Sequence, residues 1–380
     1  MQEHCDALVI GGGIFGCYAA LYLAGKGARV VLLEKEGRLF QKASLVNQAR
    51  LHSGYHYPRS VATALMSDAH KERFTTEHRP FIHFSFEKYY AIDRYGSLTD
   101  ASQFERFCQY LNIPCQRVEA HPLFNFHRLE ALFRTEEHSF DPVLLGAWYR
   151  HRVETHQSIA LWLRSRVTAA IADGDEWFVT VRIGEDTDAH DRSLRAPVVI
   201  NATYAATNAV NQLFGVPALA LTHEISEIAF AASSLLSHIG LTVMDGPFGS
   251  IMPYGRSGLL SISSVAYTHH SISYADLPAF ACQQPETDPS CSPSAPGICT
   301  TCPRRPATNA YKMIAQMRQY LADSVPLQYL FSYFTIKTKL KASYIDDGRP
   351  TEISLLRERP QFYCLFAGKV NSIYEIERML

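Results

Sequence analysis

The chain has 380 residues, of which 47% are hydrophobic and 12% aromatic, and its formal net charge is −1. This length predicts a large core and two domains, and the aromatic content excludes a chain that is disordered overall. The near-neutral charge argues against a general nucleic-acid or membrane-surface binder, because both classes need an excess of basic residues.

The N-terminal segment predicts a strand, a helix and a second strand. Asp6 to Ile10 is a short apolar run, Ile14 to Ala24 follows helical spacing, and Val30 to Leu33 is a second apolar run closed by Glu34. Residues 7–25 contain no charged side chain, but their five glycines and the lack of a basic leader argue against a transmembrane helix. We therefore expect a cytoplasmic protein without a transmembrane segment.

The rest of the chain predicts further strands and helices in alternation. Helices are expected at 61–74, 102–111, 142–155 and 310–322, with a final helix that opens at Gly368. Strands are expected at 83–92, 167–172, 177–183, 197–202, 334–342 and 362–366. Between residues 224 and 265, four short runs separated by frequent turns (224–230, 242–245, 250–253 and 259–265) predict an antiparallel sheet.

These elements predict an α/β fold with two discontinuous domains. A Rossmann-like domain, which contains the predicted strand-helix-strand unit, is expected to comprise residues 1–78, 138–220 and 340–380. An α+β substrate domain built on the antiparallel sheet is expected to comprise residues 79–137 and 221–339, with an insertion rich in Cys, Pro and Ser at 281–306.

The glycine turn between the first strand and helix predicts a dinucleotide site. Gly11 permits the tight turn, Gly13 lets the backbone approach a pyrophosphate, and Gly16 lets the helix pack closely on the sheet. Glu34 can accept hydrogen bonds from both ribose hydroxyls of an adenosine and would repel a 2′-phosphate, which disfavours NADP. The pattern alone does not separate FAD from NAD, and its place at the N-terminus of a long mixed chain favours FAD. The alternative is an ordinary strand-to-helix turn.

The sequence resembles the D-amino-acid-oxidase-like superfamily of FAD-dependent oxidoreductases, nearest the L-2-hydroxyglutarate oxidase and glycerol-3-phosphate dehydrogenase branch. The segments that carry the resemblance are Asp6 to Glu34, Asn47 to Tyr57, Asp346 to Pro350 together with Leu365 to Asn371, and more weakly Val199 to Tyr204. One departure lies in the C-terminal turn, which is usually richer in glycine and often contains histidine, whereas here Lys369 and Asn371 follow a single glycine.

The glycine-turn pattern and the resemblance together indicate which residues would contact FAD. The predicted set is Gly11, Gly13, Ile14, Phe15, Gly16, Glu34, Lys35, Ser44, Ala49, Leu51, Val167, Ala202, Thr203, Gly368, Lys369, Val370 and Asn371. Reduced flavin carries negative charge around N1, so the N–H groups that open the last helix and the charge of Lys369 would stabilise it. The alternative for Lys369 is an ordinary solvent-facing lysine.

Candidate catalytic residues lie in the segment predicted to run beside the flavin. His52 is the first choice for a general base or an electrostatic partner, followed by His56, with Tyr55 between them. The alternative for either histidine is a hydrogen-bonded structural role.

An arginine fork would bind the anionic group that substrates of this superfamily usually carry. Arg349 is the best candidate for this role, and Arg50 is the next. Tyr254 and Arg256 are weaker candidates, and for Arg256 a structural ion pair is favoured.

The nine cysteines fall into two groups. Cys5, Cys17, Cys108, Cys115 and Cys364 are expected to be reduced core residues. Cys282, Cys291, Cys299 and Cys302 lie in the insertion, where only Cys299 and Cys302 have metal-like spacing and are weak candidates. No metal is assigned. The insertion alternatively keeps reduced thiols and serves as a lid or a partner contact.

The leading hypothesis is an FAD-dependent oxidoreductase that transfers a hydride from a C–N or C–O bond to flavin N5. The expected substrate is a small anionic molecule (an amino acid, a secondary amine or a 2-hydroxy acid), and the electron acceptor is oxygen, a quinone or a protein. The alternatives are a non-redox, mutase-like flavoenzyme, an NAD-dependent dehydrogenase and a flavin-binding assembly subunit.

Overall fold

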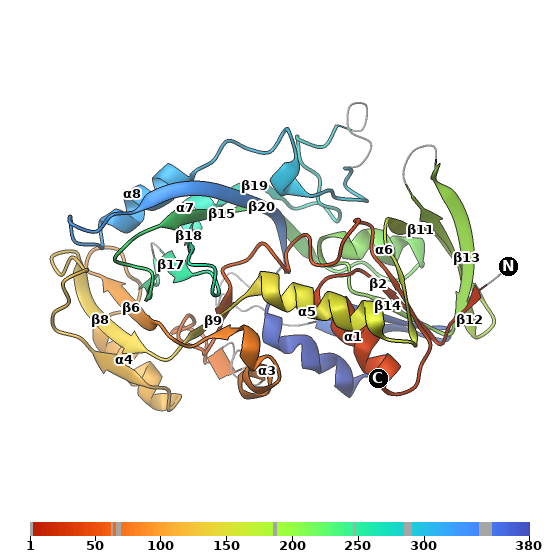
Figure 1. The fold of residues 1–380 in the computed structure, drawn as a ribbon, viewed down its shortest axis with the longest axis horizontal. Helices are drawn as coiled ribbons and strands as arrows, with labels where there is room; N and C mark the ends of the chain where they lie inside the picture. Colours follow the sequence, from red (N-terminus) through yellow and green to blue (C-terminus); the bar gives the residue numbers. More distant parts are fainter. Residues whose placement is uncertain are drawn as a thin grey trace.

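The computed structural model describes residues 3–61, 64–65, 70–184, 188–246, 248–284, 291–341 and 352–380. Its elements form an α/β fold with two main sheets, shown in Figure 1. The segment around Arg349 lies outside the described residues, as do positions 62–63 and 66–69 of the helix expected at 61–74.

A six-stranded sheet carries the N-terminal strand. Its order is β10 (Ile159–Trp162), β3 (Val30–Leu33), β2 (Ala7–Ile10), β14 (Val198–Asn201), β22 (Gln361–Phe366) and β21 (Glu352–Glu358). The first five strands are parallel, and β21 pairs with β22 in the antiparallel direction. All residues of β2 and β3 are buried, as expected for a parallel sheet that is covered on both faces.

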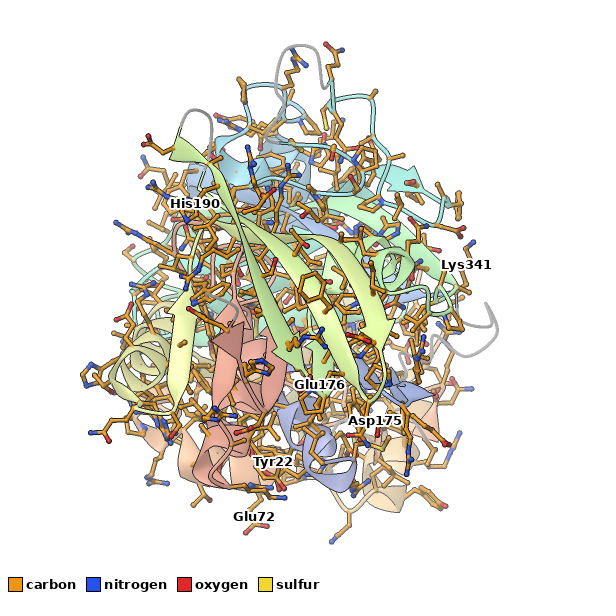
Figure 2. The ribbon with its side chains drawn as sticks, turned by 90° about the vertical axis from the view of Figure 1, so that its right-hand side faces the viewer. Tyr22, Glu72, Asp175, Glu176, His190 and Lys341 are labelled. Carbon is orange, nitrogen blue, oxygen red and sulfur yellow. The ribbon has the colours of Figure 1, made fainter. Side chains whose placement is uncertain are left out.

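Two different layers cover this sheet. Ala7 and Val9 face α1 (Ile14–Gly25) and α5 (Pro142–Thr155), which lie side by side in Figure 1. Leu8 and Ile10 point the opposite way, because successive side chains of a strand alternate between its faces. They pack on a four-stranded sheet of β1 (Glu3–His4), β13 (His190–Ala196), β12 (Glu176–Ile183) and β11 (Ser165–Asp173). Figure 2 shows its outer face, with Asp175 and Glu176 at the turn between β11 and β12.

The second main sheet is mostly antiparallel and has nine strands. Its order is β19 (His269–Ser273), β15 (Leu221–Ala232), β18 (Leu260–Ser264), β17 (Gly249–Pro253), β16 (Ile239–Met244), β6 (Glu87–Asp93), β8 (Leu129–Thr135) and β7 (Cys115–Arg117), and β20 (Gln328–Leu340) pairs with β15. Helix α8 (Ala310–Arg318) buries Met313 and Met317 against one face of it. Helix α4 (Ala101–Tyr110) packs Phe104 near β6 and β8.

A small three-stranded sheet joins the two main parts. Its strands are β4 (Arg50–Leu51), β9 (His138–Phe140) and β5 (Ile82–His83), in the order β4-β9-β5. Arg50 is paired with Ser139 and Leu51 with His138. This register places residues 47–57, which are predicted to run beside the flavin, next to Glu136 and Glu137, which directly precede β9.

The remaining described elements are short. They are α3 (Lys71–Glu77), α6 (Thr207–Leu213), α7 (Val265–Thr268) and the 3₁₀ helices η1 (Arg79–Phe81), η3 (Tyr204–Ala206), η4 (Cys299–Thr301) and η5 (Val370–Arg378). The final helix is therefore a 3₁₀ helix and starts two residues after Gly368. No helix in the described part of the chain is long and apolar enough to span a membrane.

Candidate functional site

A cavity of about 1200 Å³ lies between the carboxyl ends of β2, β3 and β14 and one face of the nine-stranded sheet. Its volume exceeds the roughly 300–1,000 Å³ that is usual for a small-molecule site. The carboxyl ends of parallel strands are also where open α/β sheets bind their ligands. The cavity therefore has the size and position to hold a dinucleotide together with a second molecule.

The glycine turn forms one wall of this cavity, and two of its glycines, Gly11 and Gly16, lie too close to neighbouring backbone to be replaced by residues with a side chain. Gly11 has a φ of +108°, and a Cβ there would lie 2.6 Å from the carbonyl oxygen of Ala202. A Cβ on Gly16 would lie 1.8 Å from the carbonyl oxygen of Gly11. The N-terminus of α1 carries no side-chain cap, although the N–H of Ile14 donates to Ser44 Oγ (3.0 Å). The turn thus leaves a helix N-terminus at the cavity, which fits a pyrophosphate.

Glu34 is fixed beside the turn through both carboxylate oxygens. The N–H of Gly12 donates to Oε2 (2.7 Å), and the N–H of Glu36 donates to Oε1 (2.8 Å). Burial raises the pKa of Glu34, while Lys42 and these two hydrogen bonds lower it and only partly offset the burial. Each oxygen has acceptor capacity left for a ribose hydroxyl, so the residues present fit the adenosine half of a dinucleotide.

Most of the predicted cofactor residues line the cavity. They are Gly11, Gly13, Ile14, Phe15, Glu34, Lys35, Ser44, Val167, Ala202, Thr203, Gly368, Lys369 and Val370. Gly16, Ala49, Leu51 and Asn371 do not line it. Gly16 instead packs against the turn, and Leu51 belongs to the hydrophobic core.

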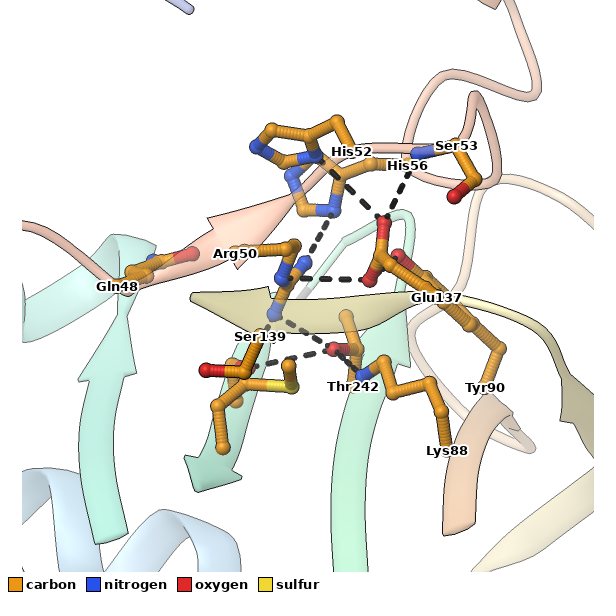
Figure 3. A network of polar contacts seen from close by, with 12 residues as sticks. Gln48, Arg50, His52, Ser53, His56, Lys88, Tyr90, Glu137, Ser139 and Thr242 are labelled. Atoms are coloured by element: carbon orange, nitrogen blue, oxygen red, sulfur yellow. Dashed lines mark hydrogen bonds and ion pairs between the residues drawn. The ribbon is translucent and has the colours of Figure 1, made fainter. Parts of the chain in front are cut away.

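A buried ion pair stands at the end of the cavity where the predicted flavin segment lies. Arg50 Nε is 3.4 Å from Glu137 Oε2, and both side chains are almost completely buried. Glu137 Oε2 also accepts a hydrogen bond from the hydroxyl of Tyr90 (2.8 Å). On the other side of the carboxylate, Oε1 lies 3.7 Å from Nδ1 of His52. Figure 3 shows how Glu137 connects Arg50 and His52.

A row of hydroxyl groups on the nine-stranded sheet faces this ion pair. Thr242, Ser250 and Ser263 are paired across β16, β17 and β18 and all line the cavity. Arg50 Nη2 donates to Thr242 Oγ1 (2.8 Å) and to Ser250 Oγ (2.5 Å). Gln48 Nε2 donates to Ser263 Oγ (2.6 Å). The row therefore fixes the segment of Gln48 and Arg50 against the sheet.

Two lysines accompany the network. Lys88 is buried behind the row and donates to Thr242 Oγ1, and its burial, followed by the charge of Arg50, brings its pKa well below the usual value. Lys369 lines the cavity at the start of η5, is only 6% exposed, and has Nζ 4.9 Å from the ring centre of Tyr57. The alternative of a solvent-facing Lys369 is therefore wrong.

The structure corrects the predicted catalytic role of Tyr55 and the weaker anion-binding candidates. Tyr55 is fully buried, donates to the carbonyl oxygen of Pro114 (2.6 Å) and does not line the cavity. Tyr254 and Arg256 also lie outside the cavity lining, where they donate to the carbonyl oxygens of Leu45 and Ile82.

Arg50 lines the cavity, but its guanidinium contacts Glu137, Thr242, Ser250 and His56, so it does not offer a fork to a substrate anion. His52 and His56 both line the cavity. Arg349 lies outside the described residues.

Sequence reasoning missed Glu137, Lys88 and the hydroxyl row. Glu137 precedes β9, and two adjacent acids at Glu136 and Glu137 are the only local signal for it. In the structure the two differ in exposure: Glu136 is exposed, whereas Glu137 is buried. Which of the two glutamates is buried depends on the pairing of β9 with β4, and no local sequence pattern specifies that pairing.

The cysteines are free thiols. Cys5, Cys17, Cys108 and Cys364 are buried as expected, whereas Cys115 is only partly buried. Among the described residues, no group of three or more His, Cys, Asp or Glu is arranged to hold a metal ion. In the insertion, the N–H of Gly297 donates to Cys291 Sγ (3.2 Å), and Lys42 Nζ donates to the carbonyl oxygen of Pro296 (2.8 Å).

Comparison with known proteins adds a family and a set of relatives. Residues 6–271 match the family described as FAD dependent oxidoreductase. The FAD-dependent monooxygenase FPY4 of Fusarium mangiferae is 25% identical over 376 residues, which cover 96% of this chain and 87% of that protein. The FAD-dependent monooxygenase kojA of Aspergillus flavus is 49% identical over 55 residues, which cover 14% of this chain and 13% of that protein.

Solved structures share the fold. Glycine oxidase from Geobacillus kaustophilus has a TM-score of 0.67 at 15% identity, with 98% of this chain and 91% of that chain covered. L-alpha-glycerophosphate oxidase from Mycoplasma pneumoniae, solved with FAD bound, has a TM-score of 0.70 at 16% identity, with 99% and 94% covered.

Proposed function

Since this chain belongs to the family of FAD-dependent oxidoreductases, we propose that it oxidises a C–O bond of a small anionic substrate, with C–N oxidation the less favoured alternative. The observation that carries this proposal is the pair formed by His52, which lines the cavity, and Glu137, which is buried behind it. An alcohol must lose a proton to a general base during oxidation, whereas an amine need only be neutral.

The pair has the features of a base held by a third group. Glu137 is positioned by Tyr90, by the N–H of Ser53 (3.4 Å) and by Arg50. Because Nδ1 of His52 faces this fixed carboxylate, Nε2 is the nitrogen that would accept the substrate proton. Figure 3 shows that ring nitrogen pointing away from Glu137.

The protons and electrons of this oxidation are accounted for without any further group from the protein. The substrate loses a proton from oxygen and a hydride from carbon, and it becomes a carbonyl compound. Bound FAD supplies the two-electron acceptor for the hydride, and oxygen, a quinone or another protein is the final acceptor. In this proposal, segments 1–78, 138–220 and 340–380 hold FAD, and segments 79–137 and 221–339 hold the substrate.

Monooxygenation is the second candidate, because the relative that aligns with 96% of this chain is named a monooxygenase. That reaction places one oxygen atom of O₂ in the product and reduces the other to water with two electrons from an external reductant such as NAD(P)H. Oxidation of an alcohol needs no external reductant. The need for NAD(P)H therefore separates the two candidates.

The experiment is anaerobic mixing of the FAD-loaded enzyme with 2-hydroxy acids, amino acids and secondary amines, followed by flavin absorbance. We expect a hydroxy acid to bleach the flavin without NAD(P)H. Bleaching by amines alone would replace C–O with C–N oxidation. Bleaching by NAD(P)H alone, with substrate oxygenation in air, would establish the monooxygenase instead.

A further inference from the structure

A second polar group lies on the half of the nine-stranded sheet formed by β15, β19 and β20. Its members all line the cavity and are Glu224, Ser226, His269, Lys337 and Lys339. Glu224 is paired with Lys337 across β15 and β20, and Ser226 is paired with His269 across β15 and β19. Because side chains two residues apart on a strand share a face, this register gathers the five side chains on one face.

The contacts centre on one carboxylate. Glu224 has a side chain that is only 4% exposed, and its Oε1 lies 2.6 Å from Lys339 Nζ. Its Oε2 lies 3.2 Å from His269 Nδ1 and 4.0 Å from Lys337 Nζ. Among the described residues, Oε2 nevertheless accepts no hydrogen bond of good geometry. The site therefore contains a buried acceptor that a ligand donor could satisfy.

The charges of the group do not balance. Among the five members, one carboxylate faces two lysines and a histidine, so cationic side chains outnumber anionic ones within the group. Burial would raise the pKa of Glu224, but His269, Lys337 and Lys339 outweigh the burial and hold the pKa below its usual value. An excess of positive charge inside a cavity favours an anionic ligand.

This group also supplies the cations for a substrate anion that Arg50 and Arg256 do not offer. Arg50 is engaged by Glu137 and the hydroxyl row, and Arg256 does not line the cavity. The lysines stand apart from the hydroxyl row that contacts Arg50, because β15 separates β20 from β18 and because β18 pairs with β15 only at residues 229–231, farther along the strand than Glu224. Two strand spacings correspond to about 10 Å. In a 2-hydroxy acid the carboxylate carbon is bonded directly to the carbon that is oxidised, so such a molecule is too short to span this separation.

We propose that Lys337, Lys339 and His269 bind a carboxylate of the substrate that is several bonds away from the carbon oxidised beside His52. Glu224 Oε2 then accepts a hydrogen bond from a hydroxyl near this carboxylate. The inference rests on the proposed function for the place of the oxidised carbon, but the binding of the carboxylate itself requires no turnover.

The test measures binding of ω-hydroxy carboxylates of increasing length and of their carboxamides to the FAD-loaded enzyme by calorimetry. We expect the wild type to prefer the carboxylates, and Lys337→Met and Lys339→Met to weaken carboxylate binding roughly 10–100-fold, as for a lost hydrogen bond to a charged group. Carboxamide binding and flavin content should stay unchanged.

Lys341→Met is the matched control. Lys341 follows β20, is exposed at the edge of the molecule (Figure 2), and does not line the cavity. Its substitution should leave binding unchanged.

Equal binding of carboxylates and carboxamides by the wild type would overturn the proposal. Loss of FAD from the lysine variants with unchanged carboxylate preference would also overturn it, because the lysines would then serve the cofactor phosphates. Either failure is distinct from failure of the oxidation itself, because binding should persist in His52→Gln, which is expected to lose turnover.

Discussion

Glu137 is the side chain that determines how Arg50 and His52 can act. Its carboxylate is buried, so it must be paired to be stable, and Arg50 provides the pair. The same carboxylate stands behind His52. A residue absent from the predicted site thus sets the geometry of two residues that were predicted.

Glu137→Gln is expected to lower the rate of anaerobic flavin bleaching by about 100-fold, because the His52 ring loses its fixed partner. The pH profile of kcat/KM should change as well, since a carboxylate beside the imidazole favours its protonated form. Glu136→Gln is the matched control, because Glu136 is the exposed neighbour. A lower rate with an unchanged pH profile would assign Glu137 a purely structural role.

The glycine turn gives a second prediction at the scale of single residues. Gly16→Ala should abolish stable FAD binding, since its Cβ would lie 1.8 Å from the carbonyl oxygen of Gly11. Gly25→Ala, in the same helix, meets no atom within 4 Å, and should be neutral or stabilising by up to about 1 kcal/mol. The flavin absorbance of the purified variants checks both. Flavin retained by Gly16→Ala would show that the turn can shift.

The local sequence predicted the glycine turn, but it did not predict which side chains of the segment around His52 are buried. Gly11, Gly16 and Glu34 are constrained by chemistry within one βαβ unit, so their spacing was sufficient. Tyr55 lies in the same segment as His52, yet it faces the core beside Tyr90 rather than the cavity. That difference depends on contacts with distant elements, which no spacing within the segment specifies.

At the scale of elements, alternation along strands places the polar groups of the cavity. Alternation along a strand at 334–342 is enough to place Lys337 and Lys339 on one face. Which face meets the cavity follows only from the pairing of β20 with β15. Strands β8 and β13 were not predicted, and the final helix is 3₁₀, because sheet neighbours and packing determine these elements more than local preference does.

Glu227 links several elements on the opposite face of β15. Its carboxylate accepts hydrogen bonds from His270 Nε2 (2.8 Å), from the N–H of Asn309 (2.9 Å) before α8, and from the hydroxyls of Thr308 and Ser332. Burial alone would raise the pKa of Glu227, but the hydrogen bonds from His270, Ser332 and Thr308 outweigh it and lower the pKa.

Glu227→Gln should lower the free energy of unfolding by about 1.5–3 kcal/mol at neutral pH, the worth of a hydrogen bond to a charged group. A lowered folded-state pKa contributes stability above the unfolded value of about 4.3, and this stability is lost as pH falls through the folded pKa. The difference between variant and wild type should therefore shrink in acid. Urea unfolding at several pH values measures it.

Glu154→Gln is the control for this experiment, because Glu154 is exposed on α5. Its effect should stay within about 0.5 kcal/mol. A constant difference between Glu227→Gln and wild type across pH would contradict the linkage to the charge of Glu227.

For the whole molecule, the cavity is assembled from segments that are distant in sequence. The six-stranded sheet takes strands from both ends of the chain, and the nine-stranded sheet takes strands from between them. The motifs that resemble a known family lie at both ends of the chain, and they predicted that both ends contribute to one domain. The strand order of the nine-stranded sheet could not be derived from the sequence, because its strands pair with partners that are distant along the chain.

A ligand that contacts both sheets stabilises the folded molecule. FAD at about 100 times its Kd should add about 2.7 kcal/mol to the free energy of unfolding of the FAD-free protein. NADP at the same concentration should add little, because Glu34 would repel its 2′-phosphate. Thermal unfolding with each ligand measures this difference. Equal stabilisation by both would contradict the role of Glu34.

Proton removal by His52 is tested most directly by the rate of anaerobic flavin bleaching in wild type and in His52→Gln, measured across pH with the hydroxy acid that reacts fastest. We expect the wild-type rate to rise with pH as the imidazole loses its proton, and the variant rate to fall by about 10²–10⁴-fold. Tyr55→Phe, which removes a hydroxyl buried outside the cavity, should keep the wild-type rate. Equal rates in wild type and His52→Gln at every pH would show that His52 is not the base.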